Sequence, residues 1–393
     1  MFWDATYRVT TPLFLGGANP DENAELRPSS LKGLLRFWFR AIAHPQLERW
    51  EEVKKLEDDI FGSTKKQSSF LLAIRQKEGL AEKKTGENWR NRPGLRYLGY
   101  GITDQQGKTL RPYLKENSKF ALQIRAKKTA PEDTAFFLPL ALQALGLFGA
   151  AGARSRKGFG SLSLESLLCN GKETWEMPTT IEKLEERQKA LLRKIKLDET
   201  DVSLPKYTAF GSQSRVWIAN TAADAVELLD AIGIEMLRYR SYGHKNKKTG
   251  THILPDDSEA EQNFAPDHDL MFDFCSGKKI QTHPQRVVFG LPHNYFFLSA
   301  RENVDIAPAN KDYSRRASPL FIHIHALNLE LYAAVLTLLP AVFLPKGEKI
   351  KISARRQKDV FNTVDVDCNV DYRHISDFMN RPAFNRDRKE IWP

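Results

Sequence analysis

The pattern of apolar and polar positions predicts strands and helices that alternate along the chain. Residues 2–10 mix aromatic and β-branched side chains and predict a first strand. Ser29 and Ser30 can cap the helix that follows. Its apolar face, which ends at Pro45, consists of Leu31, Leu34, Leu35, Trp38, Phe39 and Ile42. The pattern then predicts a charged helix over 50–61, strands over 69–76, 95–102 and 119–127, an apolar helix over 132–148 and a strand over 159–167.

This order of elements is that of a ferredoxin-like, or RNA-recognition-like, sandwich with insertions. The second half predicts strands over 207–218, 286–291, 295–299 and 319–325, and helices over 221–239 and 330–339. The halves have a similar order of elements but no sequence identity. The predicted fold class is therefore α+β, with two tandem ferredoxin-like domains.

The predicted domain boundaries follow changes in composition. We expect an N-terminal domain over 1–178, a connecting helix within 179–205 and a C-terminal domain over 206–393 with an insertion at 241–283. The charged stretch 77–94 predicts a surface loop, and residues 355–393 carry no pattern that assigns them.

The balance of charge favours a polyanionic partner. The 393 residues carry a formal net charge of +10, with a sequence pI of about 9.3. Three cysteines, far apart in the chain, support neither a disulfide framework nor a cysteine zinc site. The N-terminus has no signal-peptide pattern, and the apolar stretch near 329–344 is too short to span a bilayer. We expect a cytoplasmic protein without a membrane partner.

The most informative segment is the glycine-rich loop, defined as residues 149–160, which holds four glycines, three cations and no acid. Glycine lets a backbone approach a ligand, and Arg and Lys donate to phosphate oxygens. The loop matches neither the Walker, the Rossmann nor the kinase phosphate motif, so we expect no nucleotide cofactor. Phe159 either stacks on a base or begins the core face of the next strand. The candidate RNA-binding residues here are Gly152, Arg154, Ser155, Arg156, Lys157, Gly158 and Phe159.

A second candidate is the α-helical basic stripe, defined as Lys32, Arg36 and Arg40, which recur every four residues on one helix face. No acid occurs between Glu25 and Glu48, whereas solvated helix faces usually interleave acids with bases. The stripe thus favours phosphate binding over a merely solvated face. We expect it to flank one groove together with the glycine-rich loop.

Further basic residues occur in the second half. Arg315 and Arg316 precede the predicted strand 319–325, and we expect them to contact RNA phosphates. The run 236–255 lacks acids and mixes Arg and Lys with Tyr and His, which suits either a single-strand site or a solvated loop.

Candidate catalytic groups are isolated. His323 and His325 share one strand face and either ligate a metal or belong to the sheet surface. His44 is a candidate general acid or base without an identified partner. Asp365 and Asp367 alternate as metal carboxylates do, but such pairs are common. We expect no catalytic residues, no metal and no cofactor.

Several motifs together resemble one family. Residues 11–17, the run Arg27–Ala41 and the glycine-rich loop resemble the RAMP superfamily, the repeat-associated proteins of CRISPR systems. The runs Leu34–Arg40 and Ser314–Leu320 are most similar to the first-numbered subunits of the type III-B Cmr complex.

The resemblance implies a non-catalytic RNA-binding subunit of an RNA-guided antiviral complex. It implies contact with the 3′ region of the guide RNA or with target single-stranded RNA, and other RAMP subunits as neighbours. Two alternatives stay open: a metal-independent endoribonuclease that processes repeat RNA through His44 or His323, and a structural subunit whose cations meet acidic neighbours.

Overall fold

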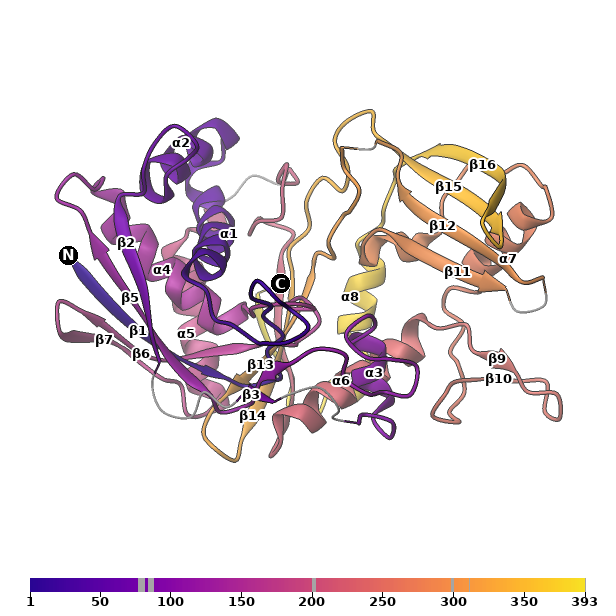
Figure 1. Cartoon of the computed structure of the whole chain (residues 1–393), viewed down its shortest axis with the longest axis horizontal. Coiled ribbons are helices and arrows are strands. Elements are labelled where there is room, and N and C mark those ends of the chain that lie inside the picture. Colours follow the sequence, from indigo (N-terminus) through magenta and orange to yellow (C-terminus); the bar gives the residue numbers. More distant parts are fainter. Residues whose placement is uncertain (77–81, 84–87, 200–202, 298–299, 311, 393) are drawn as a thin grey trace. The chain divides into compact units, whose positions relative to one another are not determined.

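The computed structural model describes residues 1–76, 82–83, 88–199, 203–297, 300–310 and 312–392 (Figure 1). Contacts divide the chain into two compact units. Unit 1 comprises Met1–Ile234, Phe321–Leu339 and Pro382–Pro393, and unit 2 comprises Glu235–Leu320 and Pro340–Arg381. Unit 2 is therefore built from two segments that interrupt unit 1 in sequence. This division does not follow the predicted boundaries at 178 and 206, which stay a prediction about domains.

The first sheet of unit 1 has the strand order β2-β5-β1-β6-β7, and all its pairs are antiparallel. Its strands are β1 (Phe2–Val9), β2 (Phe70–Gln76), β5 (Lys119–Ala126), β6 (Leu162–Cys169) and β7 (Lys172–Glu176). Counted along the chain, its first four long strands lie in the order second, third, first, fourth, which is the ferredoxin-like arrangement. The predicted fold of the first half is confirmed.

Helices cover one face of this sheet (Figure 1). α1 (Pro28–Leu47) and α4 (Asp133–Phe148) pack on the sheet, while α2 (Trp50–Phe61) packs on α1. α5 (Ile181–Lys194) packs on α4 and is followed by a short 3-10 turn, η1 (Leu197–Glu199). The predicted apolar face of α1 is correct, because Leu31, Leu35 and Trp38 are buried in the core. The helix does not end at Pro45 but continues for two more residues.

The second sheet has the order β13-β14-β8-β17. Its strands are β8 (Arg215–Ala222), β13 (Leu320–Ala326), β14 (Tyr332–Leu338) and β17 (Lys389–Trp392). The strand order along the chain is again second, third, first, fourth, with α6 (Ala225–Arg240) after the first strand and α8 (Arg373–Met379) and η3 (Pro382–Phe384) before the last. The connectivity of the first sheet is thus repeated.

Unit 2 contains a separate sheet with the order β11-β12-β15-β16. The strands of this sheet are β11 (His293–Phe297), β12 (Glu302–Pro308), β15 (Lys349–Arg356) and β16 (Asp359–Asp367). Unit 2 also contains the paired strands β9 (His244–Lys245) and β10 (His252–Ile253), helix α7 (Ala265–Cys275) and the 3-10 helix η2 (Gln285–Phe289). The predicted insertion 241–283 carries β9, β10 and α7, and the unassigned residues 355–393 supply β16, α8 and β17.

Three predicted elements are wrong. The predicted helix 330–339 is wrong, because this stretch forms strand β14. Every residue of Tyr332–Leu338 is buried, and a short run that is apolar except for Thr337 shows no helical periodicity. The predicted strand 286–291 is η2. The predicted strand 95–102 overlaps α3 (Pro93–Leu98), a short helix that begins at Pro93. In sequence, α3 lies between β3 (Glu82–Lys83) and β4 (Tyr113–Leu114). The rest of the predicted loop 77–94 lies partly outside the described residues.

Candidate nucleic-acid interface

The glycine-rich loop connects α4 to β6 and packs against the protein's own chain. Gly152 has φ +80°, and a Cβ there would lie 2.4 Å from the carbonyl oxygen of Phe14. Gly158 has φ +86°, and a Cβ would lie 2.4 Å from Leu229 Cδ1. Both residues need glycine for left-handed backbone and close packing. The expectation that these glycines open the backbone to a ligand is therefore wrong for Gly158, which is buried.

The loop also joins the two sheets of unit 1. Lys157 forms a parallel β-bridge with Ile322 of β13. Beyond the loop, Ile324 N donates to Ser161 Oγ at 3.0 Å, and Ala326 N donates to Ser163 Oγ at 2.8 Å. These serine hydroxyls supply the acceptors that a neighbouring strand would provide in a regular ladder. The C-terminal end of the loop is consequently held in one conformation by the core.

Phe159 belongs to the core and not to the surface. Its side chain has 0% exposure. The ring stacks on Trp89 with a centroid distance of 5.6 Å and meets Phe14 edge-on at 5.9 Å. Of the two predicted roles for Phe159, the structure favours the core face and excludes base stacking in this conformation.

The loop's cations differ in accessibility. Arg154 is exposed and its guanidinium donates to the carbonyl oxygen of Tyr100. Arg156 is half-buried, and its guanidinium lies 4.6 Å from the ring centroid of Phe321 and 5.3 Å from that of Phe37. Lys157 and Ser155 are half-buried as well. Arg154 is thus the loop cation most accessible to a ligand.

The basic stripe on α1 faces a carboxylate that the sequence pattern did not reveal. Glu57 of α2 is 3% exposed, and its Oε1 lies 2.7 Å from Arg40 Nη1 and 3.6 Å from Arg36 Nε. Arg36 also donates to the carbonyl oxygen of Gly62. The argument that no acid accompanies the stripe holds for α1 alone and is wrong in the folded chain. Arg36 and Arg40 still keep 30% and 28% side-chain exposure.

Lys32 lies at the other end of the stripe. Its Nζ is 5.5 Å from the ring centroid of Phe70. Burial, followed by the nearby charges of Arg36 and Lys127, lowers the pKa of Lys32. A phosphate at this point would relieve the repulsion between these cations.

Replacing Glu57 with Gln should destabilise the protein by about 1–3 kcal/mol, because the side chain keeps its size while Arg36, Arg40 and Lys54 lose their shared counter-charge. Affinity for single-stranded RNA should rise a few-fold at low salt if the stripe contacts phosphates. Urea unfolding and fluorescence anisotropy measure the two effects. The control is Glu185→Gln, which removes the same charge from the surface pair with Lys189 and should cost less than about 0.5 kcal/mol. Equal RNA affinity of wild type and Glu57→Gln would count against the stripe.

The stripe and the loop meet on neighbouring faces of α1. Arg156 contacts Phe37, which lies about 100° around the helix from Arg36. The stripe itself faces α2 and β2. The expected single groove between them stays a prediction, with Phe37 and Arg156 at the point where the two candidates come together.

Arg315 and Arg316 belong to unit 2. Arg315 is exposed. Arg316 exchanges backbone hydrogen bonds with Leu291, and its guanidinium lies 5.5 Å from the ring centroid of Phe343. Arg315 is therefore the more accessible of the two, and its role in RNA binding stays a prediction.

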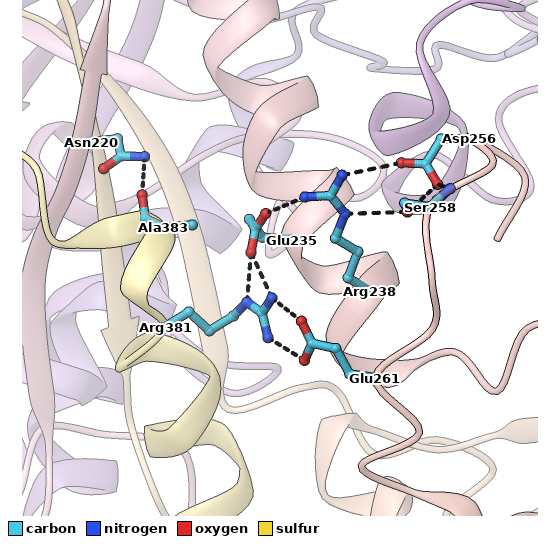
Figure 2. A network of polar contacts seen from close by, with 8 residues as sticks. All are labelled: Asn220, Glu235, Arg238, Asp256, Ser258, Glu261, Arg381 and Ala383. Atoms are coloured by element: carbon cyan, nitrogen blue, oxygen red, sulfur yellow. Dashed lines mark hydrogen bonds and ion pairs between the residues drawn. The ribbon is translucent and has the colours of Figure 1, made fainter. Parts of the chain in front are cut away.

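In the basic run 236–255, Arg238 pairs with the two acids that border the run in the sequence (Figure 2). Arg238 Nη1 lies 3.2 Å from Glu235 Oε1, and its Nη2 lies 3.7 Å from Asp256 Oδ2. Arg381 bridges Glu235 and Glu261, and its hydrogen bonds hold the pKa of Glu261 below the ordinary value. This network stabilises unit 2, so Arg238 is a structural cation.

The candidate catalytic histidines lie in different surroundings. His323 and His325 have 0% exposure, and burial lowers the pKa of His323 to about 4. His44 is half-buried beside the ring of Tyr207, and burial lowers its pKa too. Asp365 and Asp367 are exposed on β16. Within the described part of the chain, no three His, Cys, Asp or Glu side chains are placed to hold a metal ion.

Comparison with known proteins finds a family likeness in the N-terminal part of the chain. Residues 6–163 match the model of the RAMP superfamily. Over this stretch, which is less than half of the chain, the protein resembles a RAMP domain. The stretch runs from β1 into β6 and includes the stripe, α3 and the glycine-rich loop, so the resemblance inferred from the sequence is confirmed for the superfamily.

Two proteins of Pyrococcus furiosus are similar in sequence. The CRISPR system Cmr subunit Cmr1-1 is 26% identical over 214 residues, which are 50% of this chain and 62% of that protein. The Cmr subunit Cmr1-2 is 28% identical over 179 residues, 40% of this chain and 91% of that protein. The match thus spans less than two thirds of the length of Cmr1-1.

Two solved structures share the fold. The crystal structure of apo Cmr1 from Pyrococcus furiosus matches with a TM-score of 0.56 and 20% identity, over 100% of this chain and 99% of that one. A chain of the type III-B Cmr-beta complex bound to cognate target RNA matches with a TM-score of 0.50 and 14% identity, over 96% and 98%. Both likenesses extend beyond residues 6–163. No described helix is long and apolar enough to cross a membrane.

The sequence pattern led to no candidate binding residue within 88–114. Interpreted as a strand, the stretch 95–102 attracted no functional hypothesis, yet it contains Tyr100, which is 79% exposed. The available signal was Pro93-Gly94, a turn and helix-start dipeptide, followed by aromatic residues among arginines.

Proposed function

We propose that the chain is a non-catalytic RNA-binding subunit of a type III-B CRISPR effector complex. Its ligands would be the 3′ region of the guide RNA, target single-stranded RNA, or both, and other RAMP subunits would be its neighbours. The observation that carries the proposal is the sequence match to two proteins named as Cmr subunits. The net charge of +10 and the exposed Arg154 of the glycine-rich loop support a polyanionic ligand.

The non-catalytic part of the proposal is supported by where the histidines lie. His323 and His325 are enclosed in the core, where no substrate phosphate reaches them. His44 has T-shaped contact with Tyr207 and a lowered pKa, so it is mostly neutral near pH 7. The proposal includes no metal and no cofactor.

Replacing Arg154, Arg156 and Lys157 together with Ala should weaken binding of single-stranded RNA about tenfold or more at low salt, irrespective of sequence. If all three contact phosphates, the slope of log K against log salt should fall by about 2, at about 0.7 per phosphate for single strands. Fluorescence anisotropy across a salt series measures both quantities.

The matched control replaces three exposed lysines of unit 1, Lys115, Lys128 and Lys172, and so removes the same charge. If both triple variants weaken binding equally, the effect is one of net charge and the loop has no special role. Labelled repeat RNA incubated without metal tests the enzyme alternative, because cleavage that depends on His44 would overturn the non-catalytic assignment. Pulldown of complex subunits with and without RNase separates RNA tethering from direct protein contact.

A further inference from the structure

We propose that Tyr100 is a base-stacking residue of the RNA interface, paired with Arg154 as its phosphate-facing neighbour. This inference rests on the proposed function, since it needs RNA as the ligand. It also supplies what the glycine-rich loop lacks, because the loop's own aromatic residue, Phe159, is buried.

The exposure of Tyr100 is the first observation. Its side chain is 79% exposed, and none of the other exposed large apolar or aromatic side chains among the described residues reaches this fraction. An aromatic ring in water contributes nothing to the core, but it offers a flat face on which any base can stack.

The backbone that carries Tyr100 is well anchored. Gly99 N donates to Leu95 O at 2.7 Å, and Ile102 N donates to Gly99 O at 2.9 Å. The side chains of Leu98 and Ile102 on either side are buried, with 2% and 3% exposure. The ring therefore projects from a fixed turn, so binding a base requires little ordering of the backbone.

Arg154 places a cation beside this ring. Its guanidinium donates to the Tyr100 carbonyl oxygen, and Nη2 would lie 3.2 Å from a Cβ on Gly101. Gly101 has φ +89°, and its missing side chain leaves room for the guanidinium. Arg154 itself has φ +60°, a left-handed conformation that is rare for residues other than glycine and is concentrated at functional sites.

The pair combines the two elements of sequence-tolerant single-strand binding, which are a cation for the backbone and an aromatic face for a base. Phe159 stacks on Trp89, and Gly99, the residue before Tyr100, lies against the ring of Phe159. The buried side chains of the loop therefore also support the backbone at Tyr100. The loop and the tyrosine thus form one binding surface.

The test compares RNA with and without bases. Full-length protein is titrated with a labelled oligouridine and with an abasic ribose-phosphate strand of the same length. Tyr100→Ala should weaken binding of oligouridine about tenfold and leave binding of the abasic strand unchanged. Tyr100→Phe keeps the ring and should bind both as wild type does. Phe136→Ala, which removes an exposed aromatic ring on α4, is the matched control and should change neither.

Each other outcome rejects the inference in a different way. Oligouridine binding that Tyr100→Ala leaves unchanged overturns base stacking but leaves the proposed function standing. If Tyr100→Ala loses the same affinity for both strands, Tyr100 acts on the RNA backbone or on the shape of the loop, and base stacking is also overturned. Wild-type protein that binds neither strand overturns the proposed function together with this inference. Because the ring is exposed, Tyr100→Ala should unfold at the same temperature as wild type. Thermal unfolding checks this and verifies that the variant is folded.

Discussion

Replacing Gly94 with Ala should destabilise unit 1 by more than about 3 kcal/mol, because the added methyl group has no space to occupy. A Cβ on Gly94 would lie 1.9 Å from Asp230 O and 2.7 Å from Ile234 N. Both are backbone atoms of α6, so the clash can be relieved only by moving a helix. Urea unfolding followed by circular dichroism measures the loss.

Glycines on both α3 and α6 allow the two helices to approach closely. A Cβ on Gly233 of α6 would lie 2.6 Å from Gly94 Cα. The carboxylate of Asp230 accepts a hydrogen bond of 2.8 Å from Leu95 N and so satisfies a donor at the start of α3. Burial raises the pKa of this carboxyl. The α3 segment, which carries Tyr100, is therefore positioned by its crossing with α6.

Gly33→Ala is the matched control for this prediction. Gly33 lies within α1, is exposed, and has no atom within 4 Å of its Cβ position. Alanine is preferred over glycine inside a helix, so this variant should be more stable by about 0.5–1 kcal/mol. A Gly94→Ala protein within about 0.5 kcal/mol of wild type would show that the helices do not cross as closely as described.

Lowering the pH from about 7 to about 5 should destabilise unit 1 by roughly 2 kcal/mol through His323 alone, and His325 should add to the loss. Burial lowers the pKa of His323 to about 4 from 6.5, so the folded state keeps this ring neutral. Burial, followed by the charge of His323, holds the pKa of His325 well below its ordinary value. The unfolded chain therefore binds protons first. Stability should decrease as the pH falls below about 6.5, and the contribution of His323 should be exhausted near pH 4.

The geometry explains why these rings stay neutral. His323 Nδ1 donates to the carbonyl oxygen of Gly149 at 2.8 Å, which leaves Nε2 as an acceptor 3.2 Å from His325 Nδ1. A second proton on His323 would face the N–H of His325, and the nearby Arg8 adds a positive charge. Because Gly149 begins the glycine-rich loop, acid should loosen the base of that loop.

Urea unfolding at several pH values tests this in wild type and in a His323→Gln, His325→Gln variant. The variant should be less stable near neutral pH but should show a much weaker dependence on pH between about 6.5 and about 4. Comparing the slopes makes the result independent of the baseline cost of the substitutions. Parallel slopes would mean that other groups cause the acid sensitivity.

The sequence alone was sufficient for the parts of the fold with strong local periodicity. The α1 face predicted from Leu31, Leu35 and Trp38 is buried as expected. The order of elements also led to the ferredoxin-like connectivity of the first sheet, because its four long strands and the helices α1 and α4 were long enough to be identified. It failed at β14 and α3, where burial on both faces or a short helix removes the periodic signal.

For the candidate site, the sequence by itself determined the chemistry that is available: a glycine-rich basic loop, a basic stripe and a resemblance to the RAMP superfamily over residues 6–163. Only the tertiary structure decided which of these groups are exposed to solvent. It buries Phe159, places Glu57 against Arg36 and Arg40, and leaves Tyr100 beside Arg154 in water. The physical reason is that charge pairing and exposure depend on segments distant in sequence, which no local pattern of residues encodes.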